Sequence, residues 1–181
     1  MQLLALNTFG GIPAHPLLVH IPVMMIPLAL ALTVLAFWGR VRTSALWGAT
    51  GAAFIGLIGC FLASGSGEAL ENAVEKSALL RKHTEAGDAV AAFTAPFFIV
   101  LLAVLVIHLA RNEALPFGLK LPKLRTIGAG VVTGLLVLST ALGALASWKT
   151  YEAGHSGAKS AWNDVDLSKV TEGHGDGGDG D

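Results

Sequence analysis

Four long apolar segments alternate with short polar connections along this chain of 181 residues. Each segment has almost no charge and holds about 20 residues, the length with which an α-helix crosses the hydrocarbon core of a bilayer. The pattern predicts four membrane-spanning helices, at residues 17–38, 45–63, 89–110 and 126–148. After the second segment, Glu68, Glu71 and Glu75 follow helical spacing, so we expect that helix to continue beyond the membrane.

The composition agrees with a membrane protein, because 53% of the residues are hydrophobic and only 14% are charged. Soluble domains carry about 25% charged residues. With a net charge of −1 and no basic or aromatic motif, binding to nucleic acid is not expected. Cys60 is the only cysteine, which excludes an intramolecular disulfide and a thiolate zinc cage. The N-terminus lacks the basic start of a signal peptide, so the first segment is interpreted as a retained span.

Prolines and small residues predict how the helices pack. Pro22 and Pro27 lie inside the first span and remove backbone hydrogen bonds, so a kinked helix packed against protein is expected. In the fourth span, Gly130 and Gly134 form a candidate close-packing pair. A longer stripe of small residues on the second span predicts another close helix contact, at Gly48, Ala52, Gly56, Cys60 and Ser64.

Basic residues indicate the orientation, because cytoplasmic loops are rich in lysine and arginine. The first and third connections are rich in basic residues, and Glu113 is their one acidic residue. The basic residues are Arg40, Arg42, Arg111, Lys120, Lys123 and Arg125. We therefore predict an all-α, integral membrane four-helix bundle with both termini on the non-cytoplasmic side. Its expected place is the inner (cytoplasmic) membrane of a bacterium. The predicted division is an outer segment at 1–16, a membrane domain at 17–148 and a polar tail at 149–181, disordered near its end.

Four histidines are predicted to lie at the outer end of the bundle: His15, His20, His83 and His155. An imidazole inside a bilayer is costly without a partner, and His20 is expected about one turn inside it, aimed inward by the proline kink. Met24 follows one turn later on the same face. His15 and His20 are five residues apart, about 140° around a helix, so one straight helix cannot aim both at one ion.

Three chemistries fit such a cluster: a b-type haem between two imidazoles, a copper or zinc ion, or proton transfer. For a cofactor, the candidates are His20 and His83 as ligands and His155 as a third. For a metal ion, His15 and Met24 are further candidates, although His15 taken singly is interpreted as an ordinary interfacial histidine. Because the inner end offers only His108, any haem is expected to be a single centre near the outer face.

No covalent-haem, zinc-protease, phosphate-loop or serine-hydrolase motif occurs in the sequence, and no catalytic residue is assigned. Whether the chain is an enzyme is left open. The main hypothesis is a haem- or metal-binding electron-transfer component. The alternative is a structural or assembly subunit that uses its small-residue stripes to hold a larger membrane complex or a second copy of itself. A transporter is disfavoured, because no acidic side chain lies deep in any span.

Three segments also carry a family resemblance, at residues 15–22 (HPLLVHIP), 64–85 and 151–162 (YEAGHSGAKSAW). Together they resemble a bacterial family of predicted four-helix membrane proteins, DUF2231, over about residues 15–162. The resemblance implies an integral membrane protein whose relatives are sometimes fused or adjacent to cytochrome-type modules. That association favours redox work with a redox or respiratory-complex partner, and it implies no particular activity.

Overall fold

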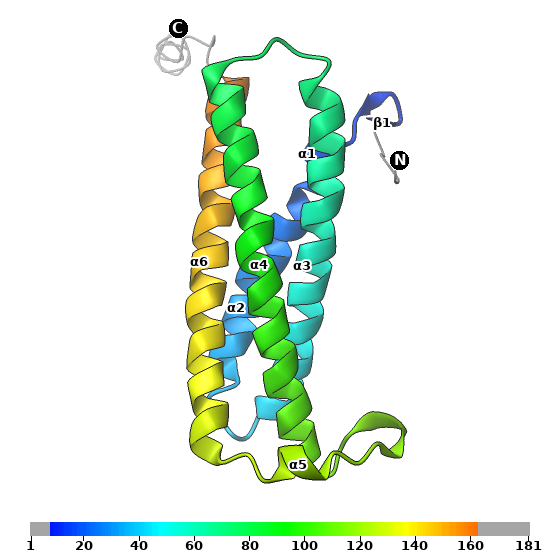
Figure 1. Cartoon of the computed structure of the whole chain (residues 1–181). Helices are drawn as coiled ribbons and strands as arrows, with labels where there is room; N and C mark the ends of the chain where they lie inside the picture. The colour runs from blue at the N-terminus through cyan, green and yellow to red at the C-terminus, as the bar shows by residue number, and fades with distance from the viewer. Residues whose placement is uncertain (1–7, 163–181) are drawn as a thin grey trace, which may run out of the picture.

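Four long helices run side by side in the computed structural model, which describes residues 8–162 (Figure 1). They are α2 (His20–Leu35), α3 (Arg42–Glu71), α4 (Ala78–Arg111) and α6 (Ala129–Ala161). The remaining elements are short: β1 (Thr8–Phe9), β2 (Ile12–Pro13), α1 (His15–Leu18), η1 (Pro116–Gly118) and α5 (Pro122–Arg125). All four long helices, α2 together with α1, are long and apolar enough to cross a membrane. The prediction of a helical protein with four spans is therefore confirmed.

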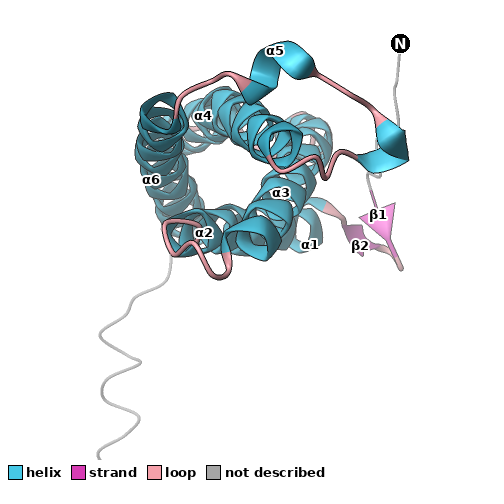
Figure 2. Cartoon of the chain, turned by 90° about the horizontal axis from the view of Figure 1, so that it is seen from below, coloured by secondary structure: helices cyan, strands magenta, loops and turns pink. Residues whose placement is uncertain are grey.

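The four helices form a ring in which each contacts the two beside it (Figure 2). Helix α2 lies between α3 and α6, and α4 lies between α3 and α6 on the other side, so α2 and α4 face each other diagonally. Residues 8 and 162 lie at the same end as the α3–α4 connection, which we call the terminal end (Figure 1). The opposite end, which carries Arg40, Lys120, Lys123 and Arg125, is called the basic end.

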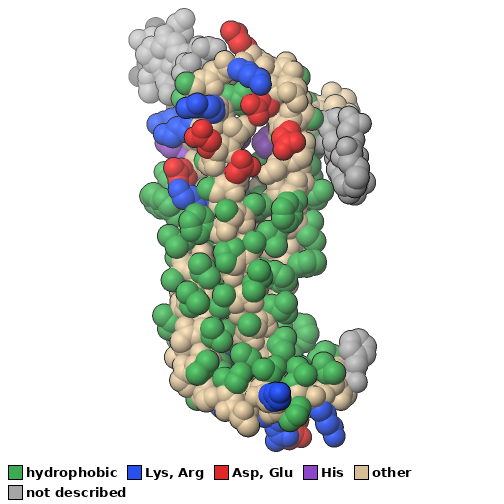
Figure 3. All heavy atoms as spheres, in the orientation of Figure 1, with side chains coloured by type: hydrophobic (Ala, Val, Ile, Leu, Met, Phe, Trp, Pro, Cys, Tyr) green, Lys and Arg blue, Asp and Glu red, His purple; other side chains and the backbone are tan. Residues whose placement is uncertain are grey.

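A belt of hydrophobic side chains covers the middle of the molecule, and charged side chains gather at both ends (Figure 3). Helices α4 and α6 contain 34 and 33 residues. At 1.5 Å per residue each is about 50 Å long, well beyond a hydrocarbon core of about 30 Å. Both exceed their predicted spans at the terminal end: α4 begins at Ala78 instead of residue 89, and α6 continues to Ala161 instead of ending at 148.

The first span is interrupted at Val19, which separates α1 from α2. Pro22 follows three residues later and lacks the N–H that would bond the carbonyl of Leu18. The exposed imidazole of His20 donates from Nδ1 to the carbonyl of Pro16 at 2.7 Å, which satisfies a backbone acceptor beside the interruption. The proline-induced break therefore occurs at the start of the span, whereas Pro27 lies within the continuous helix α2.

Close packing between α2 and α3 uses the predicted stripe of small residues. Methyl groups added at two members of the stripe, Gly48 and Gly56, would lie 3.1 Å from Leu32 and 3.0 Å from Ile26. Gly59, which is not part of the predicted stripe, packs closer still, because a methyl group there would lie 2.6 Å from Ile21. The same prediction for Gly130 and Gly134 is wrong: no neighbouring atom lies within 4 Å of a methyl group at either position. Both glycines lie on the exposed side of α6, so their small size does not bring another helix of this chain closer to α6.

The buried side chains change in size along the bundle. The main cluster fills the middle and the basic half, and its largest fully buried members include Phe97, Leu46, Leu101 and Val104. A smaller cluster follows toward the terminal end, made of Ile26, Cys60, Val90 and Ala146. Beyond it the buried side chains are small, including Ala63, Ser66, Ala86, Thr150 and Ser156. The terminal end is therefore packed by closely approaching backbones and short side chains.

Candidate functional site

Two histidines meet across the terminal end of the bundle. His15 is the first residue of α1 and His83 lies in the second turn of α4, so they come from the first and third spans. Their ring centroids are 5.9 Å apart and the ring planes are inclined by 81°. Both side chains are half-buried. Figure 3 shows histidine at this end of the molecule, among the charged side chains and above the hydrophobic belt.

His15 is held by one turn of α3. Its Nδ1 lies 2.9 Å from the carbonyl oxygen of Ala63 and 3.4 Å from Ser66 Oγ. Ser66 itself donates to the same carbonyl at 2.9 Å. Gly67 lies directly beneath the ring, since a methyl group there would be 3.1 Å from two imidazole atoms. The imidazole is therefore held by the carbonyl of Ala63, the hydroxyl of Ser66 and the backbone of Gly67, which we call the seat of His15.

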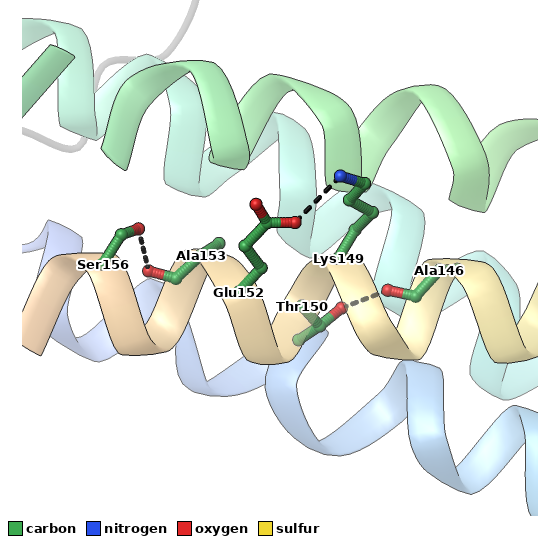
Figure 4. A network of polar contacts seen from close by, with 6 residues as sticks. All are labelled: Ala146, Lys149, Thr150, Glu152, Ala153 and Ser156. Carbon is green, nitrogen blue, oxygen red and sulfur yellow. Dashed lines mark hydrogen bonds and ion pairs between the residues drawn. The ribbon is translucent and has the colours of Figure 1, made fainter. Parts of the chain in front are cut away.

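His83 is held by α6 in the same way. Its Nδ1 lies 3.0 Å from the carbonyl oxygen of Ala153 and 3.5 Å from Ser156 Oγ. Ser156 donates to that carbonyl at 2.9 Å, as Figure 4 shows. A methyl group at Gly157 would approach the imidazole to 2.9 Å. One turn earlier, Lys149 and Glu152 form an ion pair at 2.8 Å on the same helix (Figure 4).

The two seats share a sequence pattern, A-x-x-S-G, at residues 63–67 and 153–157. In each case the histidine lies near the start of one arm of a helical hairpin and the pattern lies near the end of the other arm: α1 and α2 with α3, and α4 with α6. The terminal end is therefore built from two matching halves that meet at the imidazoles. The repeated A-x-x-S-G pattern is visible in the sequence, but the histidines precede it by different intervals, 48 residues from His15 to Ala63 and 70 from His83 to Ala153.

The seats determine which nitrogen each imidazole can offer. A carbonyl oxygen only accepts hydrogen bonds, so Nδ1 of each ring carries the proton and donates it. In a neutral imidazole with this tautomer, Nε2 keeps its lone pair, and no group within residues 8–162 forms a hydrogen bond to Nε2 of His15 or His83. Histidines that bind metals in proteins are commonly held in this manner, with the other ring nitrogen donating to a carbonyl.

The structure does not bring the other predicted ligands to this pair. His20 and Met24 both lie on the exposed face of α2, and Met24 is 65% exposed. The buried face of that helix is formed instead by Pro22, Ile26, Ala29 and Thr33. The interpretation that a kink aims His20 inward is therefore wrong, because two residues of helix turn place His20 nearly opposite Pro22.

His155 is also directed away from the pair. It is exposed and stacks on Tyr151, with ring centroids 5.8 Å apart and planes inclined by 10°. Tyr151 in turn contacts Trp148, and both aromatic side chains are at least 60% exposed. These three residues form an outward-facing aromatic row on α6, typical of the membrane–water interface. The fourth expected outer histidine, His83, is the one that the structure places inside with His15.

At the basic end, His108 stands apart from the other histidines, as expected from the sequence. Its Nε2 lies 2.9 Å from Thr43 Oγ1, which joins α4 to α3. Within the described residues, no group of three or more histidine, cysteine, aspartate or glutamate side chains is arranged to hold a metal ion. His174 and the acidic tail fall outside the described residues.

Comparison with known proteins assigns the chain to a family. The model of the family described as predicted membrane protein (DUF2231) matches residues 11–165, and the chain belongs to this family. No curated protein and no solved structure matches the chain. The resemblance noted in residues 15–162 is thereby confirmed, and the family description agrees with the four membrane-spanning helices.

Proposed function

We propose that this member of the DUF2231 family binds one b-type haem between His15 and His83 and acts as an electron-transfer component of the membrane. The observation that carries the proposal is the pair itself: two imidazoles from the first and third spans, each with Nδ1 engaged by a carbonyl and Nε2 left to ligate. Haem supplies one-electron redox chemistry, and its axial ligands set the potential.

The separation of the rings supports two ligands on one ion. With metal–nitrogen bonds of about 2 Å, two imidazoles on opposite sides of one metal place their ring centroids roughly 6 Å apart. The observed separation is 5.9 Å. Perpendicular ring planes are compatible with this arrangement, since each ring rotates about its own metal–nitrogen bond.

The number of ligands favours haem over a bare copper or zinc ion. Protein sites for zinc normally contain three or four side-chain ligands, and blue-copper sites contain at least three. The described residues offer two imidazoles and no cluster of three metal-binding side chains. A porphyrin provides four nitrogen ligands itself, so two axial histidines complete its iron.

The pair lies among short side chains just beyond the hydrophobic belt. Small buried side chains such as Ala63, Ala86 and Ser156 surround the pair. The seat of His83 at residues 153–157 lies one to three turns beyond Trp148 on α6, close to the outward-facing aromatic row. If the basic end faces the cytoplasm, as its arginine and lysine content indicates, His15 and His83 would hold a haem near the outer face of a bacterial inner membrane, within reach of an external redox partner or a quinone.

Absorption spectra of purified variants test the proposal. We expect the wild-type protein to show a Soret band and about one haem per chain by the pyridine assay. His15→Ala and His83→Ala should each lower the haem content by about tenfold or more, since each removes an axial ligand. His20→Ala and His155→Ala are matched controls, because both histidines are at the same end but face outward. Wild-type protein that is colourless and free of metal after haem-sufficient expression would overturn the proposal, as would haem content that falls only in the controls.

A structural role is the second candidate, and the two seats favour it specifically. Each imidazole joins the two arms of its own hairpin through a carbonyl, which would hold the terminal end together without any cofactor. In that case the protein would be a non-catalytic or assembly subunit. His83→Ala would then lower the thermal stability of a colourless protein, and the native protein would co-purify with stable partners.

A further inference from the structure

A cavity of about 500 Å³ lies at the basic end, far from the histidine pair. Figure 2 views this end along the bundle. The cavity lies among α3, α4 and α6, with Phe37 from the α2–α3 connection at its rim. Its volume is in the range of small-molecule sites, roughly 300–1,000 Å³. Neither the haem proposal nor the family description assigns a role to it.

The cavity has two chemically different ends. The inner end, directed toward the middle of the bundle, is lined by buried apolar side chains: Leu46, Val104, Val132 and Leu136. The outer end is polar and positively charged, with half-buried Arg42 and His108 beside exposed Arg111 and Asn112. Since Val104, His108 and Arg111 follow one another along α4 by three to four residues, the surface changes from apolar to cationic within two turns.

The two arginines are available to an anion. Within residues 8–162, neither Arg42 nor Arg111 forms an ion pair with a carboxylate. Arg42 donates from Nε to the carbonyl of Ala36 at 2.9 Å and from Nη2 to that of Phe37 at 3.3 Å, which holds its guanidinium at the rim while Nη1 keeps its donors. Glu113, the acidic residue of this end, is paired with Arg125 at 2.7 Å.

We infer that the cavity binds an anionic amphiphile, with a phosphate or carboxylate head between Arg42 and Arg111 and an alkyl chain along Leu46, Val104 and Leu136. Guanidinium groups recognise both head groups through charge-assisted hydrogen bonds. The apolar inner end lies at the level of the membrane-spanning belt, where an alkyl chain has its natural environment. A free fatty acid and a membrane phospholipid share this chemistry.

Binding to the purified protein in a neutral maltoside detergent tests the inference, using palmitate and 16-carbon lysophosphatidic acid as probes. We expect saturable binding at one site per chain, measured by calorimetry and native mass spectrometry. Arg111→Gln should lower the affinity for both probes by about tenfold, because it removes a charge-assisted hydrogen bond to the head group. Arg111 is exposed, so we expect this variant to fold normally. Lys120→Gln is the matched control, since it removes the same charge from the same end outside the cavity.

Further binding experiments test the cationic outer end and the apolar inner end of the cavity separately. Inorganic phosphate and the neutral 16-carbon monoacylglycerol should each bind at least about tenfold more weakly than lysophosphatidic acid, because each supplies only half of the contacts. Val104→Phe, which fills the inner end of the cavity, should lower the affinity for palmitate more than the affinity for octanoate, because the longer alkyl chain reaches further into the cavity. Phosphatidic acid that competes with palmitate would identify a membrane lipid as the source, and failure to compete would identify a free single-chain acid. Equal binding of the monoacylglycerol, or equal losses in Arg111→Gln and Lys120→Gln, would overturn the inference without affecting the haem proposal.

Discussion

The two ends of this bundle use the same four helices for different purposes. At the basic end and in the middle, large side chains such as Phe97, Leu101 and Val104 fill the interior, and His108 has only a threonine partner from a neighbouring helix. At the terminal end, alanine, serine and glycine replace them, and two imidazoles take the interior positions. Lipid gives helices no hydrophobic reason to associate, so both ends depend on close packing and hydrogen bonds. The difference teaches that the terminal end gives up large apolar contacts in order to hold two oriented rings.

The largest expected effect on stability belongs to the packed region. Phe97 is fully buried and lies against Gly143, where an added methyl group would be 2.8 Å from its ring. Phe97→Ala should lower the free energy of unfolding by roughly 3 kcal/mol, through the cavity that it leaves. Thermal unfolding in mixed micelles measures this loss. The haem content of the folded variant should stay near that of the wild type, and parallel loss of haem would show that the two regions are not separable.

A smaller effect on stability is expected at the contact between the backbone of Gly157 and the imidazole of His83. Gly157→Ala places a methyl group 2.9 Å from the ring of His83, so it should displace the ring, lower the haem content and cost about 1–2 kcal/mol of stability by overpacking. Gly154→Ala is the matched control on the same helix, because nothing lies within 4 Å of its added methyl group. That control should gain stability, by up to about 1 kcal/mol, from higher helix propensity. Equal behaviour of the two variants would contradict the seat described for His83.

The smallest effect tests whether the two seats are equivalent. Ser66→Ala and Ser156→Ala each remove a hydroxyl that shares the carbonyl acceptor with an imidazole. Each variant should lose about 1 kcal/mol or less, since the imidazole keeps its own bond to that carbonyl. If the protein binds haem as proposed, redox titration should show shifts of the midpoint potential in the same direction for both variants. Opposite shifts would show that the halves, despite their shared pattern, influence the iron differently.

Sequence reasoning predicted the four spans, the stripe of small residues on α3 and the grouping of His15 and His83 at one end of the bundle. At the terminal end it made α4 and α6 too short, because hydropathy detects where the membrane ends and not where a helix ends. It also chose His20 over His15, since a long apolar run hides a one-residue interruption such as Val19. The error in Gly130 and Gly134 has the same origin: small residues permit a close contact, and only the arrangement of neighbouring helices decides whether one forms.

The sequence by itself determined that this is a helical membrane protein with four spans, because length, hydropathy and charge are properties of each segment alone. Only the tertiary structure decided which histidines meet, since the rotation of each helix about its axis depends on the packing of its neighbours. A change of two residues turns a side chain about 200° around a helix, enough to exchange the interior for the lipid face. Contacts between residues 15 and 83 are therefore a property of the assembled bundle, and they carry the function proposed for it.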